Sequence, residues 1–334
     1  MNVLVTGNLG YVGSELTSYL KNNEKKINIY GLDIGYFKKN KTSKKKDKIK
    51  KQYICDVRKL NSKYLKNIDT VIHLAAISND PIGNTFEKQT YDINVKATKK
   101  LIDICSKLKI KNFIFASSCS VYGFTKKICT EKTRVKPLTA YAKSKVIIEN
   151  YLKNRFKFNS TCLRFATACG GSSRLRIDLV LNDFVASAIK KKKIILNSTG
   201  DAYRPLIDVK DMCKSIHWSM RDRNLIKKKF ICLNIGNSKN NFKIIDLAKK
   251  VKKKYKNMQI ITNSKNKDNR SYKASFLQYQ KLAKKYPINY NVNKSILDLN
   301  KILKNYPKSK YDTLIRLNYL KKLINQNIIS KNLK

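Results

Sequence analysis

The sequence is poor in proline, glycine and acidic residues. Its 334 residues include 5 Pro, 11 Gly, 22 Asp and Glu, 2 His and 1 Trp. No Pro/Gly/Ser-rich linker or internal repeat is present, so we expect lobes that share an extended interface rather than tethered domains. No apolar run approaches the length of a membrane span, and residues 1–5 are too short for the apolar region of a cleavable signal. We therefore expect a cytoplasmic protein with no membrane partner.

Cysteine pairs at metal or redox spacing are also missing. The eight cysteines are scattered, and several, such as Cys162 and Cys232, lie in apolar segments typical of strands. This usage is typical of buried, reduced thiols in a cytoplasmic protein, and it predicts no metal site.

The shortage of acid leaves a large positive charge. Against 22 acidic residues stand 73 Lys and Arg, for a formal net charge of +51. Such a surplus is typical of proteins that bind nucleic acid or anionic membranes. Here the lysines are spread over nearly every predicted surface helix, beside frequent Asn and Ile, as a coding bias toward A/T-rich codons produces. We expect a solvated basic surface without a nucleic-acid partner. The densest run, residues 38–51, predicts a loop between two strands, and an acidic partner for that loop stays open.

Short apolar strands alternate with amphipathic helices. The patterns predict strands at 3–6, 27–32, 53–55, 70–74, 112–116 and 160–165, and helices at 11–20, 90–108 and 141–151. This alternation, with right-handed crossovers, predicts an α/β fold with a doubly wound parallel sheet of the Rossmann type. We assign residues 1–168 to a nucleotide-binding domain, with a return segment at about 206–235. Residues 169–205 and 236–334 would form a smaller, non-contiguous α/β lobe that binds substrate.

A glycine-rich turn joins the first strand to its helix. Gly7, Gly10 and Gly13 allow a tight turn and let backbone N–H groups approach a pyrophosphate at the helix N-terminus. The spacing departs from the G-x-G-x-x-G fingerprint, but the strand–turn–helix context fits it. We predict a dinucleotide site that also includes Tyr11 and Val12.

Two aspartates extend this predicted site. Asp33 ends the second strand, where a carboxylate binds the adenosine ribose hydroxyls and repels a 2′-phosphate. Asp56 follows the third strand, and we expect it near the adenine amino group. The cofactor predicted is therefore NAD rather than NADP.

A second constellation can move a proton. Tyr141 and Lys145 are four residues apart on a predicted helix and hence on one face. A free tyrosine has a pKa near ~10, and we expect the Lys145 ammonium and a positive nicotinamide to lower it. Ser118, at the end of the preceding strand, would orient the same substrate hydroxyl. A Tyr-x-x-x-Lys pattern alone is common in a lysine-rich chain, so its weight comes from the glycine-rich turn and Ser118.

As a set, these motifs resemble the NAD-dependent epimerase/dehydratase family, extended short-chain dehydrogenases that act on nucleotide sugars. The likeness spans about residues 1–275 and is carried by Thr6–Gly13, His73-Leu74-Ala75-Ala76, Asn94, Phe115–Gly123, Tyr141–Lys145, Leu163–Thr167 and Arg204–Val209.

The resemblance implies roles for particular residues. Ala75 and Ala76 would line the cofactor, Asn94 would support a proton-relay water, and Ser118, Tyr141 and Lys145 would be catalytic. It also implies a homodimer formed through the two helices near 90–108 and 140–155. We expect His73 to be a structural residue at a strand end, and His217 to be a packing residue.

For a nucleotide-sugar substrate, the arginines are the main candidates because guanidinium donors suit phosphate oxygens. Arg174, Arg176 and Asn182 could hold a base and diphosphate. The resemblance assigns Arg204 and Arg270 to the diphosphate. The resemblance also places Thr167 near the phosphates, at a position where many relatives carry Asn, so that one phosphate contact differs from the family pattern.

The residues after Ser118 bear on the reaction. A 4,6-dehydratase of this family carries a carboxylate there, whereas this chain has Cys119 and Ser120. We therefore expect a nucleotide-sugar 4-epimerase that uses Tyr141 as base and acid. The alternatives are a C4 dehydrogenase or ketoreductase, and an NAD-binding scaffold whose basic surface binds a polyanion. Cys119 could instead shuttle a proton for 3- or 5-epimerisation, although a packing role is favoured.

Overall fold

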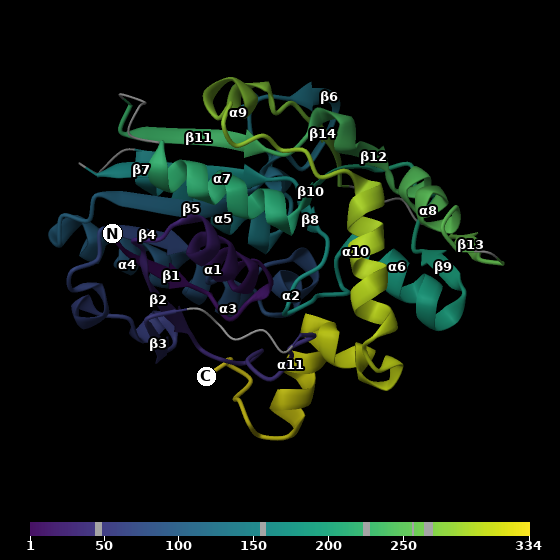
Figure 1. Cartoon of the computed structure of the whole chain (residues 1–334), viewed down its shortest axis with the longest axis horizontal. Coiled ribbons are helices and arrows are strands. Elements are labelled where there is room, and N and C mark those ends of the chain that lie inside the picture. The colour runs from purple at the N-terminus through teal and green to yellow at the C-terminus, as the bar shows by residue number, and fades with distance from the viewer. Residues whose placement is uncertain (44–48, 154–157, 223–227, 256, 264–269) are drawn as a thin grey trace.

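A computed structural model describes residues 1–43, 49–153, 158–222, 228–255, 257–263 and 270–334. Its centre is a seven-stranded sheet in the order β11-β7-β5-β4-β1-β2-β3, with every pair parallel (Figure 1). The strands are β1 (Asn2–Thr6), β2 (Asn28–Asp33), β3 (Lys51–Ile54), β4 (Thr70–His73), β5 (Asn112–Ser118), β7 (Asn159–Phe165) and β11 (Phe230–Ile235). The predicted α/β fold with a doubly wound parallel sheet is confirmed.

Helices cover both faces of the sheet, because successive side chains of its central strands point to opposite faces and are buried on both. In β1, Val3 and Val5 belong to one buried cluster and Leu4 to the other. α1 (Tyr11–Asn23) and α7 (Val209–Arg221) lie side by side on the first face (Figure 1). α4 (Thr98–Lys107) and α5 (Ala140–Lys153) cover the second.

The helix predicted at 90–108 is interrupted. α3 (Glu87–Tyr91) passes into a π-helical segment, Asp92–Ala97, before α4 begins. Such segments are rare and occur at functional sites. A short helix, α2 (Asp80–Thr85), precedes α3.

The remaining elements form smaller sheets and a helical cluster. β8 (Thr167–Cys169), β10 (Tyr203–Asp208) and β12 (Asn241–Lys243) make one sheet, β9 (Lys193–Leu196) pairs with β13 (Gln259–Thr262), and β6 (Phe124–Cys129) pairs with β14 (Ser271–Ala274). Helices α6 (Val180–Lys191), α8 (Ile244–Lys252), α9 (Leu277–Leu282), α10 (Val292–Lys304) and α11 (Arg316–Asn325) complete the chain. Of the expected return to the main sheet, β11 joins it, whereas β10 pairs with β8 instead.

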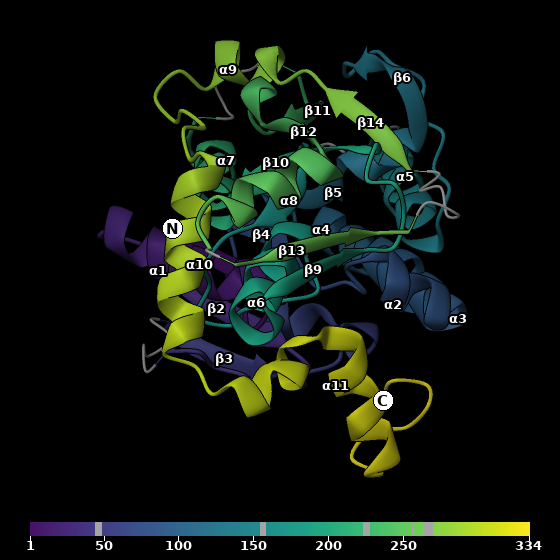
Figure 2. The same ribbon diagram turned by 90° about the vertical axis from the view of Figure 1, so that its right-hand side faces the viewer.

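The C-terminal segment packs against α2 and the loop that follows β4. α10 passes along α6, and α11 with the C-terminus lies at the lower end of the molecule (Figures 1 and 2). There Leu320, Leu323 and Leu333 pack with Ile77 and Ile82.

Residues 44–48 of the predicted lysine-rich loop lie outside the described residues. None of the helices that the structure describes is long and apolar enough to cross a membrane.

Candidate active site

A cavity of about 730 Å³ lies across the carboxyl ends of the central strands. Its lining includes the glycine-rich turn after β1, the ends of β2, β4 and β5, and the start of α5. Residues from later in the chain, including some between 176 and 184 and some between 315 and 333, complete the lining. Ligands of open parallel α/β sheets bind at this edge. Its position is therefore that expected for the predicted cofactor and substrate residues.

The glycine-rich turn has no room for side chains. Gly7 has φ +74°, and a Cβ there would lie 2.7 Å from the backbone N of Ala75. A Cβ at Gly13 would lie 2.3 Å from the carbonyl oxygen of Gly7. Helix α1 begins after Gly10 with no side-chain cap and no acidic residue in its first turn. Its N-terminus can therefore accept an anion, which fits the diphosphate of a dinucleotide.

Asp33 is held at the end of β2 by backbone donors. Its carboxylate accepts hydrogen bonds from the N–H of Leu9 at 3.1 Å and of Gly35 at 2.7 Å. Burial raises the pKa of Asp33, although these bonds oppose the rise. Asp56 also lines the cavity and forms an ion pair with Arg58 at 2.6 Å.

The remaining predicted cofactor residues Tyr11, Val12, Ala75 and Ala76 line the same cavity. The residues present therefore fit NAD. The glycine-rich turn leaves room for the diphosphate, and the Asp33 carboxylate is held in place to bind the ribose.

His73 has a structural position. It is fully buried, with Nδ1 2.8 Å from the hydroxyl of Thr6 and Nε2 2.9 Å from that of Thr98. Burial lowers the pKa of His73 to about 3, so the ring is neutral at physiological pH. His217 is also buried, with Nε2 2.6 Å from Glu24. These positions agree with the structural and packing roles expected for the two histidines.

Tyr141, Ser118 and Lys145 face the cavity together. Tyr141 and Ser118 line the same wall of the cavity, and Lys145 Nζ lies 5.3 Å from the centre of the Tyr141 ring. Lys145 donates to the carbonyl of Ala116 at 2.7 Å. Helix α5 begins at Ala140 and so presents Tyr141 and Lys145 one turn apart.

The pKa of Tyr141 differs from the expected direction. Burial and the charge of Asp80 raise it to about 12, whereas the Ser118 side chain and the charge of Arg176 oppose the rise. Burial also lowers the pKa of Lys145 to about 8, although the charge of Glu149 opposes this. In the protein without nucleotide, desolvation therefore outweighs the nearby positive charges.

Asn94 lies behind the cavity wall rather than in its lining. Its side-chain amide accepts from the N–H of Ile77 and donates to its carbonyl, both at 2.9 Å, and donates to Ser144 at 3.2 Å. Asn94 thus fixes the loop that follows β4. Its role with a proton-relay water stays a prediction.

The substrate-side predictions divide into two groups. Thr167, Arg176, Arg204 and Arg270 line the cavity, whereas Arg174 and Asn182 are fully buried and do not appear in the described lining. Asn182 donates to the carbonyl of Arg176 at 2.8 Å and so supports the loop that carries it. The binding roles of Arg174 and Asn182 stay predictions.

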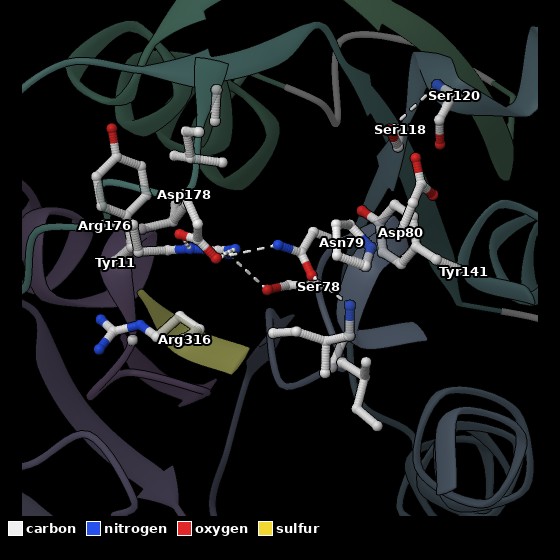
Figure 3. Close-up of a pocket in the computed structure, with 18 of the residues that line it drawn as sticks. Tyr11, Ser78, Asn79, Asp80, Ser118, Ser120, Tyr141, Arg176, Asp178 and Arg316 are labelled. Carbon is white, nitrogen blue, oxygen red and sulfur yellow. Dashed lines mark hydrogen bonds and ion pairs between the residues drawn. The ribbon is translucent and has the colours of Figure 1, made fainter. Parts of the chain in front are cut away.

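Two of the arginines that line the cavity, Arg176 and Arg270, have carboxylate partners. Arg176 forms two hydrogen bonds to Asp178, at 2.9 and 2.8 Å, and one to Ser78 at 2.7 Å (Figure 3). Arg270 pairs with Asp80 at 2.7 Å, and its carbonyl accepts from Arg204. Asp268 and Asn269, which precede Arg270 in the predicted late element, lie outside the described residues.

Cys119 does not reach the cavity. It is fully buried, donates to the carbonyl of Arg164 at 3.1 Å, and has a pKa raised by burial. A thiol behind the wall does not reach a sugar in the cavity, so its position contradicts the proton-shuttle hypothesis and agrees with a packing role. Among the described residues, no group of three or more His, Cys, Asp or Glu could hold a metal ion.

Three residues that line the cavity were not predicted from the sequence. Asp80 and Asp178 are partners of predicted arginines, and Arg316 comes from α11, close to the C-terminus. Asp178 stands two residues after Arg176 and could have been suspected. Arg316 has no motif around it.

Comparison with known proteins agrees with this geometry. Residues 3–236 match the NAD dependent epimerase/dehydratase family. The chain belongs to that family. It is therefore an enzyme that uses NAD, the family's cofactor, and the resemblance found in the sequence is confirmed.

Individual relatives are distant. The chain is 28% identical to an uncharacterised UDP-glucose epimerase of Bacillus subtilis, YtcB, and 29% identical to a putative UDP-glucose 4-epimerase of Methanocaldococcus jannaschii. Each alignment covers 71% of this chain and 77% of the relative.

Solved structures share the fold at low identity. MoeE5 in complex with UDP-glucose and NAD has a TM-score of 0.78 at 22% identity, covering 91% of this chain and 99% of MoeE5. UDP-glucuronic acid 4-epimerase from Bacillus cereus, with UDP-glucuronic acid and NAD, has a TM-score of 0.76 at 23% identity, with the same coverage.

Proposed function

We propose that this enzyme is a nucleotide-sugar 4-epimerase that oxidises the sugar C4 hydroxyl transiently and returns hydride to the opposite face. The observation that carries the proposal is that Tyr141, Ser118 and Lys145 line one cavity, with Lys145 Nζ 5.3 Å from the centre of the Tyr141 ring. In addition, Cys119 and Ser120 stand where a dehydratase carries a carboxylate. NAD, when bound, accepts a hydride from a carbon and can return it.

The chain's own residues handle the proton. Tyr141 removes the C4 hydroxyl proton as hydride leaves the carbon, and it returns that proton after the 4-ketose has turned over. Ser118 orients the hydroxyl, and the Lys145 ammonium favours the tyrosinate. Because the pKa of Tyr141 is raised to about 12 without nucleotide, the positive nicotinamide must supply part of the lowering.

Dehydration needs a further acid and base. The carboxylate near Tyr141 is that of Asp80, and both of its oxygens already accept hydrogen bonds. Asp80 accepts from Thr139 at 2.6 Å through one oxygen and from Arg270 at 2.7 Å through the other. This arrangement favours epimerisation over dehydration. Arg204, Arg270 and Arg176 are proposed to hold the diphosphate and nucleotide, because they line the same cavity as Tyr141.

The homodimer remains a proposal, formed through the face of α4 and α5. The lobes at 1–168 with 206–235, and at 169–205 with 236–334, are likewise proposed as the cofactor and substrate parts. The substrate class proposed is a nucleoside-diphosphate hexose, and several relatives are named for UDP-glucose.

The test is incubation of the full chain with UDP-, GDP-, dTDP- and CDP-hexoses, without added cofactor, followed by NMR of the products. We expect C4 epimers to interconvert, and Tyr141→Phe to lower the rate by about 10²–10⁴-fold. Tyr91→Phe is the matched control, because Tyr91 is 49% exposed and away from the cavity. Turnover only with added NAD or NADH, and with stoichiometric cofactor change, would identify a C4 dehydrogenase or ketoreductase instead.

A further inference from the structure

The C-terminal helix brings an arginine into the cofactor half of the cavity. Arg316, the first residue of α11, lines the cavity together with the glycine-rich turn and Asp33. Its side chain reaches from α11 to the side where Tyr11 and Arg176 lie (Figure 3). The far end of the chain therefore contributes to the site formed by its beginning.

The Arg316 guanidinium is buried and incompletely paired. The residue is 3% exposed, and Nη2 donates to the carbonyl of Arg174 at 3.1 Å. Nη1 is buried and has no hydrogen-bond partner among the described residues. The centre of the Phe37 ring lies 4.0 Å from the guanidinium carbon of Arg316, so the ring covers one face of this group. A buried donor left without an acceptor is unfavourable, so this position suits a ligand that supplies one.

The charge of Arg316 is also poorly balanced. Burial and the charge of Arg176 lower its pKa to about 9, against the attraction of Asp178 and Asp33. Asp178 is engaged by two bonds from Arg176, and Asp33 by two backbone N–H groups. An anion in the cavity would relieve the remaining positive charge.

We propose that Arg316 is a cofactor-binding residue whose unpaired Nη1 contacts the diphosphate of NAD. The uncapped N-terminus of α1 lies in the same half of the cavity, and a guanidinium suits phosphate oxygens. The Asp33 carboxylate opposes a 2′-phosphate nearby. The substrate half has its own arginines, Arg204 and Arg270.

This contact would tie the C-terminal segment to the bound cofactor. Leu320 and Leu333 line the cavity beside Arg316, and Arg58 donates to the carbonyl of Asn332 at 3.0 Å. The segment thus forms a wall of the NAD site. The inference rests on NAD binding and not on the proposed C4 reaction, so binding measurements test it separately.

The test titrates the nucleotide-free full chain with NAD, ADP, adenosine and UDP by calorimetry. The variants are Arg316→Gln and Arg316→Lys, with Lys321→Gln as the control because Lys321 is exposed on the same helix. We expect Arg316→Gln to weaken NAD and ADP roughly 10- to 100-fold, as loss of a charged hydrogen bond does. Adenosine and UDP affinities should stay within about twofold, Arg316→Lys should recover part of the loss, and Lys321→Gln should match the wild type.

The ADP-to-adenosine ratio, measured on the same variant, separates a phosphate contact from damage to the fold. Equal losses for ADP and adenosine would mean that Arg316 only holds α11 in place, and would overturn the proposal. A loss for UDP with ADP unchanged would assign Arg316 to the substrate, and unchanged NAD affinity would exclude it from the site. Without nucleotide, the melting temperature of Arg316→Gln should not fall, because a buried and partly unpaired charge is removed.

Discussion

Lys145 supplies charge beside Tyr141 but is expected to lower the stability of the fold. It is 4% exposed, and burial lowers its pKa from 10.5 to about 8 despite the charge of Glu149. The folded pKa lies below the unfolded value, so between about pH 8 and pH 10.5 the unfolded chain binds more protons. In that window the Lys145 contribution to stability rises with pH.

The size of the effect follows from this pKa. At about 1.4 kcal/mol per pKa unit, the buried ammonium costs about 3 kcal/mol at pH 7 and about 1.4 kcal/mol at pH 9.5. Lys145→Met removes the charge at similar volume. We therefore expect the nucleotide-free variant to be more stable than the wild type at pH 7, by an amount that falls by about 2 kcal/mol at pH 9.5. Its catalytic rate should fall sharply because the tyrosinate loses its neighbouring charge.

The assay is urea unfolding of the full chain at pH 7.0 and pH 9.5. Lys143→Met is the matched control, because Lys143 is exposed on the same helix, and its effect should stay within about 0.5 kcal/mol at both pH values. A difference between Lys145→Met and wild type that is equal at the two pH values, or larger at pH 9.5, would refute the reasoning.

Two further predictions concern the turn and the support of the site. Gly13→Ala should lower NAD affinity at least about tenfold, because its Cβ would lie 2.3 Å from the Gly7 carbonyl oxygen; calorimetry showing unchanged affinity would contradict this. Glu149→Gln should destabilise the protein by about 3–5 kcal/mol in urea unfolding, because Arg164, bonded to it at 2.7–3.2 Å, stays buried without its counter-charge. Lys111→Gln, which breaks an exposed ion pair, should cost at most about 1 kcal/mol, and equal losses for the two variants would argue against the burial argument.

Local patterns predicted the central sheet well because each strand alternates between two buried faces. The sequence could not show where β10 pairs, since an apolar strand near residue 206 suits either sheet equally. Nor could it show the π-helical interruption. In that segment, Asn94 is hydrogen-bonded to the backbone of Ile77. This contact depends on a loop 17 residues away in the sequence, and not on neighbours within the helix.

The site was predictable where chemistry follows a turn or a helical spacing. Gly7, Gly13, Asp33, Tyr141 and Lys145 all line one cavity, as expected from strand ends of a parallel sheet. The direction of the Tyr141 pKa was not predictable, because desolvation depends on how deeply α5 is covered. Burial of this kind is a property of the packed molecule and has no signature in a five-residue motif.

The distribution of the two basic residue types supports both the surface interpretation and the role of Arg316. The chain has 62 lysines and 11 arginines, yet in the part that the structure describes five arginines and one lysine are buried. If A/T-rich codons favour lysine on the solvated surface, arginine persists where a planar, always-charged group with several donors is needed. Arg164 satisfies Glu149 in this way, and Arg176 satisfies Asp178. Arg316 is buried like them but has no carboxylate bonded to it among the described residues, which is why its partner is sought in the bound cofactor.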